Sequence, residues 1–281
     1  MELLKKERFL LMTAISMVVA SCEPGVDFTF PVPADQRFEE SRTRSAKKSS
    51  DEITVQSDDY SVIFMADTHV GTTHNIDSVF RIAEATNVSA VCIAGDLTQG
   101  EINDFPVFEQ SVPYRDEIPT FLTPGNHDLW SDEGWKTYFE LFGPSSYYFT
   151  VRTPVASDIF ISIDSGTGTL GSKQLEWLED ILQNQRSACR RCIIFTHNDF
   201  LRVRHSEISN PPVEELSLLI DLFTRYHVDM LVAGHDHEPS EELFGITEYV
   251  IAGAISDNDE DPNYMILKVE KGNLVNEFVN L

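Results

Sequence analysis

The stretches YSVIFMADTH (residues 60–69) and AVCIAGD (residues 90–96) decide the fold of this chain. Each is a short apolar run of buried-strand length that ends in polar residues. Between them, apolar residues recur at helical spacing over residues 76–86. A strand, a helix and a second strand in this order form a βαβ unit, which makes the two strands parallel. Because ligands bind beyond the carboxyl ends of parallel strands, we expect a site there, with Asp67, His69 and Asp96 as its first candidates.

Three further apolar runs along the chain end in residues of the same kind. They are FLTPGNHD (121–128) with Asn126, His127 and Asp128, CIIFTH (192–197) with His197, and VDMLVAGHDH (228–237) with His235 and His237. Five of the eight histidines of the chain, at positions 69, 127, 197, 235 and 237, therefore lie at the ends of apolar runs. A parallel sheet would gather them at one edge.

This set of side chains favours a metal site over a structural role. A single histidine at a strand end is more often a structural hydrogen-bonding residue. Several converging imidazoles, carboxylates and amide oxygens are costly to bury unless they are satisfied, and metal ions satisfy them. The mixture of nitrogen and oxygen ligands suits Mn, Fe, Co, Ni or Zn rather than the all-oxygen site of calcium.

The order of the motifs Asp-x-His, Gly-Asp, Gly-Asn-His-Asp, His and Gly-His-Asp-His resembles the calcineurin-like metallophosphoesterase family over about residues 60–270. The resemblance implies an α/β protein, a four-layer α/β/β/α sandwich of two mixed sheets, with a centre of two divalent transition-metal ions. Carried over by position, one metal would be held by Asp67, His69, Asp96 and His237. The other would be held by Asp96, Asn126, His197 and His235, so that Asp96 bridges the two ions.

The resemblance further implies a hydrolase that cleaves a phosphomonoester or a phosphodiester by in-line attack of a metal-bridging hydroxide. His127 binds neither metal in this assignment and is the candidate general acid toward the leaving oxygen, with Asp128 orienting its ring. Gln99 stands three residues after Asp96, where purple acid phosphatases of the same fold have Tyr, so an Fe(III)-tyrosinate centre is not expected.

The sequence leaves other functional hypotheses open. It does not decide between a monoester and a diester substrate. One alternative is a non-catalytic binding or scaffold protein that keeps the metallophosphoesterase fold, and another is a solute-binding lipoprotein. Since the ligands and His127 are all present, the enzyme is the leading hypothesis.

Composition limits the partners of the protein. The 281 residues include 42% hydrophobic residues, which is enough for a packed core. Their formal net charge of -25 excludes a generally basic surface that would follow nucleic-acid phosphates. A small phosphoester substrate must therefore be attracted locally, by bound metal cations.

The first residues are typical of an export signal. Lys5, Lys6 and Arg8 precede an apolar run over residues 9–20, which is too short for an ordinary membrane helix. The run ends in Val-Ala-Ser-Cys and resembles the lipobox of bacterial lipoproteins, in which Cys22 becomes the acylated first residue. A plain signal peptide with an incidental cysteine is the alternative.

From this pattern we expect three parts along the chain. Residues 1–21 form a lipoprotein signal peptide, residues 22–58 a flexible tether, and residues 59–281 the metallophosphoesterase domain. The mature protein would be exported and held on a membrane of a bacterial cell envelope by its lipid anchor.

Two weaker motifs have mainly structural interpretations. Cys189 and Cys192 form a single C-x-x-C pair, which leaves a structural disulfide open and gives no support for zinc or redox chemistry. Residues 257–261 imitate the start of a calcium loop. Pro262 and Lys268 occupy positions where that loop needs Gly and Glu, which indicates a solvated acidic turn.

A small basic island follows His197 in this acidic chain. It consists of Arg202, Arg204 and His205. It is either a solvated surface segment or a contact that helps to hold the phosphate or the leaving group of the substrate.

Overall fold

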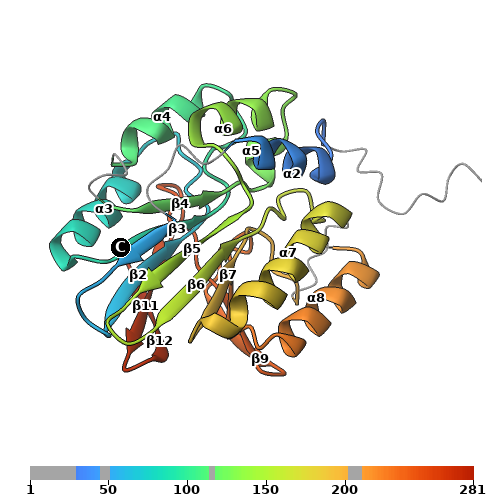
Figure 1. Ribbon diagram of the computed structural model, residues 1–281. Coiled ribbons are helices and arrows are strands. Elements are labelled where there is room, and N and C mark those ends of the chain that lie inside the picture. The colour runs from blue at the N-terminus through green and yellow to red at the C-terminus, as the bar shows by residue number, and fades with distance from the viewer. Residues whose placement is uncertain (1–29, 45–50, 114–117, 202–210) are drawn as a thin grey trace, which may run out of the picture.

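The computed structural model describes residues 30–44, 51–113, 118–201 and 211–281. Two β-sheets pack face to face, and helices lie on the outer face of each sheet (Figure 1). Helices α3, α4 and α6 cover the five-stranded sheet, while α7 and α8 cover the seven-stranded sheet. The predicted four-layer α/β/β/α sandwich is confirmed.

The five-stranded sheet has the strand order β12-β11-β2-β3-β4. Strands β2, β3 and β4 are parallel, whereas β11 is antiparallel to β2 and pairs with β12 in a hairpin. The predicted βαβ unit is confirmed, with shifts of one or two residues at its ends. The elements of this half are β2 (Tyr60–Met65), α3 (His74–Thr86), β3 (Ala90–Ala94), α4 (Asp104–Ser111), β4 (Thr120–Thr123), α5 (Asn126–Leu129), α6 (Gly134–Phe142), β11 (Asn263–Glu270) and β12 (Asn273–Asn280).

The seven-stranded sheet has the strand order β1-β5-β6-β7-β8-β10-β9. It is mixed, because β6, β7, β8 and β10 run parallel while β5 and β9 run antiparallel to their neighbours β6 and β10. The elements of this half are β1 (Glu52–Thr54), β5 (Tyr147–Arg152), β6 (Ser157–Ser162), α7 (Ser172–Gln185), the 3-10 turn η1 (Arg186–Ala188), β7 (Cys192–Phe195), α8 (Val213–Arg225), β8 (Met230–Ala233), β9 (Ser240–Phe244) and β10 (Thr247–Ile251).

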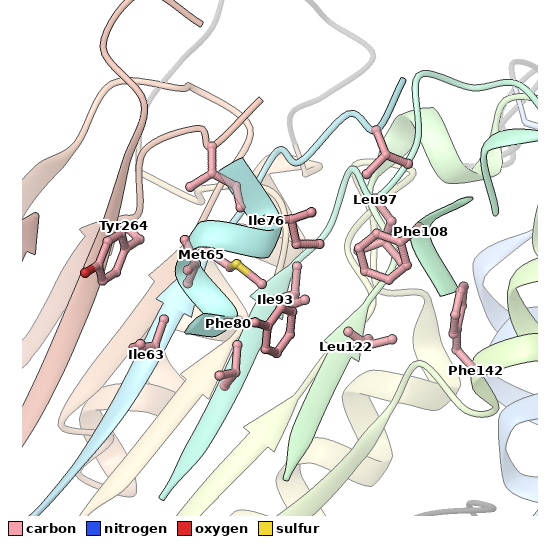
Figure 2. Packing of buried hydrophobic residues seen from close by; sticks show 14 of the residues in the cluster. Ile63, Met65, Ile76, Phe80, Ile93, Leu97, Phe108, Leu122, Phe142 and Tyr264 are labelled. Carbon is pink, nitrogen blue, oxygen red and sulfur yellow. The ribbon is translucent and has the colours of Figure 1, made fainter. Parts of the chain in front are cut away.

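Burial on both faces explains why the central strands read as continuous apolar runs. Along β2, Ile63 and Met65 pack under the helices, as Figure 2 shows, while Val62 and Phe64 face the second sheet. Successive side chains of a strand point to opposite faces, so both sets must be apolar when both faces are covered. The strands β2, β3 and β4 therefore have no polar face, whereas the edge strand β12 is partly exposed and carries polar residues.

The segment expected to be a flexible tether over residues 22–58 contains folded structure, and the expectation is wrong for that part. Helix α2 (Ala34–Thr43) packs on α7, where Phe38 meets Trp177 at a ring-centroid distance of 5.8 Å. Strand β1 pairs in parallel with β5. Helix α2 is polar in composition, yet it contains the fully buried Arg37. The side chains that accept hydrogen bonds from Arg37 lie far away in the sequence.

Parts of the predicted tether and the whole predicted signal peptide lie outside the described residues. These are residues 22–29 and 45–50 of the tether and residues 1–21, together with the acylation site proposed at Cys22. Within the described ranges, no helix is both long and apolar enough to cross a membrane.

The weaker sequence motifs have structural roles where they are described. Cys189 and Cys192 are free thiols, so the pair forms no disulfide here. Asp257 accepts hydrogen bonds from the backbone N–H groups of His74 (3.0 Å) and Asn75 (2.7 Å) at the start of α3. The basic island at residues 202, 204 and 205 lies outside the described residues.

Candidate metal centre

Strands from both sheets deliver the predicted ligands to one place. Asp67 and His69 follow β2, Asp96 follows β3 and Asn126 follows β4, whereas His197 follows β7 and two histidines follow β8. Donor atoms of these residues form groups in which all atoms lie within 4.8 Å of one another. The groups are Asp67, His69 and His237; His69, Asp96 and His127; and Asp96, His197 and His235.

The first group has the arrangement of an incomplete coordination shell. Nε2 of His237 lies 3.4 Å from Oδ1 of Asp67 and 3.4 Å from Nε2 of His69. Asp67 is completely buried, and its Oδ1 has no hydrogen-bond partner. A buried carboxylate oxygen without a partner is costly, so a cation at this point fits the residues that are present.

The third group, together with Asn126, joins the other predicted ligands. Nε2 of His197 lies 3.0 Å from Oδ1 of Asn126, 3.2 Å from Nδ1 of His235 and 3.4 Å from Oδ2 of Asp96. The same Asp96 oxygen lies 3.7 Å from Nε2 of His69. Asp96 thus faces His69 of the first group and His197 of the third group, as the predicted bridging role requires.

Backbone carbonyls orient two of the imidazoles. Nδ1 of His197 lies 2.8 Å from the carbonyl of Ala94, and Nδ1 of His69 lies 3.2 Å from the carbonyl of Thr98. A carbonyl only accepts hydrogen bonds, so each Nδ1 carries a proton, and in the neutral ring Nε2 presents a lone pair to the centre. This is the tautomer that binds a metal through Nε2.

The charges of the centre are strongly coupled. Burial alone would lower the pKa of His197, but the charge of Asp96 outweighs it and raises that pKa to about 9. Burial alone would raise the pKa of Asp96, yet the charge of His197 and their contact hold it well below its usual range. Without a metal, the centre therefore keeps a proton on His197.

The backbone at the ligands is strained. Asp67, His69, Asp96, His235 and His237 have φ values of 51°, 41°, 50°, 72° and 63°. Residues other than glycine pay about 1–3 kcal/mol each in this left-handed region, and such residues cluster at functional sites. The strain turns successive polar side chains of one turn toward the same point.

Glycines next to the ligands leave space that a side chain would fill. A Cβ at Gly125 would lie 2.1 Å from Oδ1 of Asp96, and a Cβ at Gly95 would lie 2.6 Å from Nδ1 of His197. Gly95 also has a φ of 84°. The Gly-Asp and Gly-Asn-His-Asp motifs therefore need their glycines for the close approach of the strand ends.

His127 lies at the edge of the centre. Its Nε2 is 3.8 Å from Oδ2 of Asp96, and its side chain is 23% exposed. Its ring lies against Trp130 at a centroid distance of 3.7 Å, with the two ring planes tilted by 37°. Its Nδ1 lies 3.1 Å from the carbonyl of Gln99. Gln99 and Trp130 thus hold the ring while one nitrogen faces the centre.

Asp128 does not have the predicted role of orienting His127. Its two oxygens instead accept hydrogen bonds from the backbone N–H groups of Leu97 (3.1 Å), Thr98 (3.0 Å) and Gly125 (2.8 Å), and from the hydroxyl of Thr98. Burial and the charge of Asp96 raise the pKa of Asp128 to about 7, although its donors oppose the shift. Asp128 ties the end of β3 to the end of β4.

Two residues near the centre were missed by the sequence reasoning. Trp130 follows His127 by three residues, a spacing at which helical neighbours meet, so the pattern would have revealed it. Asp259 lies with Oδ2 3.6 Å from Nδ1 of His237. Asp259 belongs to the segment that the sequence predicts to be a solvated acidic turn. No local sequence pattern connects it with His237, which lies 22 residues earlier.

The fold is that of the metallophosphoesterases. The chain belongs to the calcineurin-like phosphoesterase family, which matches residues 60–239. Members of this family use divalent metals, and the donor groups described above fit such ions. A comparison with curated protein sequences gave no match.

Solved structures with a similar fold include both phosphatases and an anchor protein. GAP50, the anchor in the inner membrane complex of Plasmodium, has a TM-score of 0.63 and 15% identity, covering 79% of this chain and 84% of that chain. A dimetal phosphatase from Danio rerio has a TM-score of 0.57 and 11% identity, covering 79% and 98%. A phosphatase from Mycoplasma pneumoniae has a TM-score of 0.50 and 13% identity, covering 79% and 93%. At these identities, the similarity shows the fold alone.

The proton on His197 predicts a pH dependence of metal binding. Because its pKa is raised from 6.5 to about 9, the proton stabilises the metal-free fold fully below pH 6.5, and this contribution is lost as the pH rises through about 9. A metal must displace that proton, so the affinity for Mn²⁺ should rise between these two pH values. Calorimetric titration over this range measures the effect, and His197→Gln should reduce it. An affinity of the native protein that stays constant across the range contradicts this prediction.

Proposed function

We propose that this protein is a two-metal hydrolase that cleaves a phosphomonoester or a phosphodiester. The observation that carries the proposal is the arrangement around Asp96, which faces His69 on one side and His197 on the other. Each side has further nitrogen and oxygen donors, and the orphaned Oδ1 of Asp67 calls for a cation. Two divalent transition metals bound there would activate water at neutral pH and offset charge on the phosphoryl group.

The protein's own residues would hold and protonate the reactants. Asp67, His69 and His237 support one ion, Asn126, His197 and His235 support the other, and Asp96 supports both. When its ring carries a proton on both nitrogens, His127 gives the proton on Nε2 to the leaving oxygen, because Nδ1–H is engaged by the carbonyl of Gln99 and Nε2 faces the centre. Four of the proposed ligands, Asp67, His69, Asp96 and His197, are buried, which limits the access of bulk water to the charges that the reaction would develop.

A non-catalytic scaffold is the second candidate function. It is supported by the fold similarity to GAP50, which has the highest TM-score among the structures compared above. The complete ligand set and His127 argue against it, because neither would be needed for a purely structural partner.

Hydrolysis assays separate the two functions. The purified protein loaded with Mn²⁺, Co²⁺ or Zn²⁺ should hydrolyse p-nitrophenyl phosphate or bis-p-nitrophenyl phosphate, and the faster of the two defines the substrate class. Chelation should abolish turnover and metal addition should restore it, since the ions supply the nucleophile. Bound metal confirmed by elemental analysis, together with no hydrolysis across a broad phosphoester panel, would favour the scaffold.

Replacement of His127 tests its role as the acid. His127→Ala should keep both metals but lose about 10²- to 10⁴-fold in turnover, and the loss should be larger for alkyl esters, whose leaving group needs a proton. His227→Asn is a matched control, because His227 is exposed before β8 and Asn tolerates its left-handed backbone. Turnover and metal content are measured together. Loss of metal in His127→Ala would move His127 into the ligand set.

We also propose that the protein is exported and anchored in a bacterial cell envelope through Cys22. The basic start, the short apolar run and the lipobox-like Val-Ala-Ser-Cys sequence support this proposal. Cys22→Ser in the full-length chain should move the protein from the membrane fraction to the soluble fraction after cell breakage. Recovery of this variant in the membrane fraction at the native level would refute the anchor.

A further inference from the structure

A fully buried arginine lies outside the part of the chain that matches the family. Arg37 belongs to the N-terminal strap, which we define as residues 30–44, whereas the family match begins at residue 60. Its guanidinium donates to both oxygens of Asp164 (2.9 and 3.0 Å), to the hydroxyl of Thr167 (3.1 Å) and to the carbonyl of Val32 (2.7 Å). A buried charge with every contact in place fixes the groups that it binds, because leaving any of them unpaired is costly.

The partners of Arg37 lie in a loop that contacts two ligand-bearing strand ends. We call residues 163–167 the hub loop; it follows β6. Thr123 and Thr196 both donate from their hydroxyls to the carbonyl of Ile163, at 3.1 and 2.9 Å. Ser165 accepts a hydrogen bond from the backbone N–H of Asn198 (2.8 Å) through its hydroxyl.

The hub loop also packs directly on the turn that carries Asn126. A Cβ at Gly166 would lie 3.0 Å from the backbone of Gly125 and 2.8 Å from the side chain of Leu129, so no side chain fits between the loop and this turn. Asp164 in turn accepts a hydrogen bond from the backbone N–H of Gly166. The contacts therefore run from Arg37 through Asp164 to the residues beside Asn126 and His197.

The other ligands are held by different contacts. Asp67 and His69 donate their backbone N–H groups to the carbonyls of Gly95 and Asp96, both at 3.0 Å, and His237 faces Asp259. We propose that Arg37 is a positioning residue for Asn126 and His197. It would thus support the metal subsite that these two residues complete with His235 and the shared Asp96, and not the subsite completed by Asp67, His69 and His237. The inference rests on the proposed two-metal centre and does not depend on the reaction that it catalyses.

Metal titration in single-site backgrounds tests this assignment. His69→Ala should leave mainly the Asn126 subsite, and His197→Ala mainly the Asp67 subsite. Arg37→Met should lower Mn²⁺ affinity about 10- to 100-fold in the first background, the usual effect of losing outer support, and change it less than twofold in the second. Calorimetry and elemental analysis of the full-length chain give both values without any assay of turnover.

Controls separate positioning from general stability. Gln36→Ala changes an exposed neighbour on the same helix and should bind both metals like the native protein, while Arg37→Lys should recover part of the affinity. Arg37→Met leaves the carboxylate of Asp164 buried without the guanidinium that it binds, which destabilises the fold. A double variant, Arg37→Met with Asp164→Leu, replaces the ion pair by an apolar pair and should fold stably. Thermal melting of the metal-free variants monitors folding, and the double variant should still lose the Asn126 subsite.

Several outcomes overturn the inference. Native affinity at both subsites in the folded variants, or an equal loss in the two backgrounds, excludes a positioning role at one subsite. Native protein that binds two metals without turnover refutes the proposed hydrolase and leaves the role of Arg37 standing. Native protein that binds no metal refutes both.

Discussion

The close approach of strand ends from two different sheets is the constraint on which the centre depends. Three of these strands belong to the five-stranded sheet and two to the seven-stranded sheet, and the ligands that follow them must meet within a few ångströms. Glycines at positions 95, 125 and 234 make this possible, since a Cβ at each would lie under 3 Å from a neighbouring ligand or strand end. The hydrophobic core between the sheets sets their spacing. The free energy gained by packing this core offsets the strain of the left-handed turns, which orient the predicted ligands.

Much of the centre was predictable because its signals are local. A buried strand needs a continuous apolar run, and a polar residue directly after such a run must lie at the edge of the sheet. All seven predicted ligands, from Asp67 to His237, lie together in the structure. The parallel order of β2 and β3 followed from the helix between the two runs, so the edge at which these strands end was also predictable from short-range patterns.

Contacts between residues far apart in the sequence were beyond such reasoning. Asp128 was expected to serve the adjacent His127, yet its partners lie 30 and 31 residues earlier, where β3 ends. Arg37 and Asp164 are separated by 127 residues, so a polar stretch that reads as a tether is a packed strap. In both cases a polar side chain is buried because a residue far away in the sequence forms hydrogen bonds with it. The composition of a segment shows that its residues are polar but does not show such distant partners.

In the proposed mechanism, the surroundings of two histidines, rather than their residue type, distinguish the ligand His197 from the acid His127. His127 and His197 both present Nε2 to Asp96, and both have Nδ1 against a carbonyl. His197 is completely buried, so its ring does not contact solvent, and an ion that binds to it would displace its proton. His127 is partly exposed and rests on Trp130, which is 49% exposed itself. An acid that gives up a proton in every turnover must regain one from solvent. Of the three histidines that face Oδ2 of Asp96, which are His69, His127 and His197, His127 has the most exposed side chain and best meets that requirement.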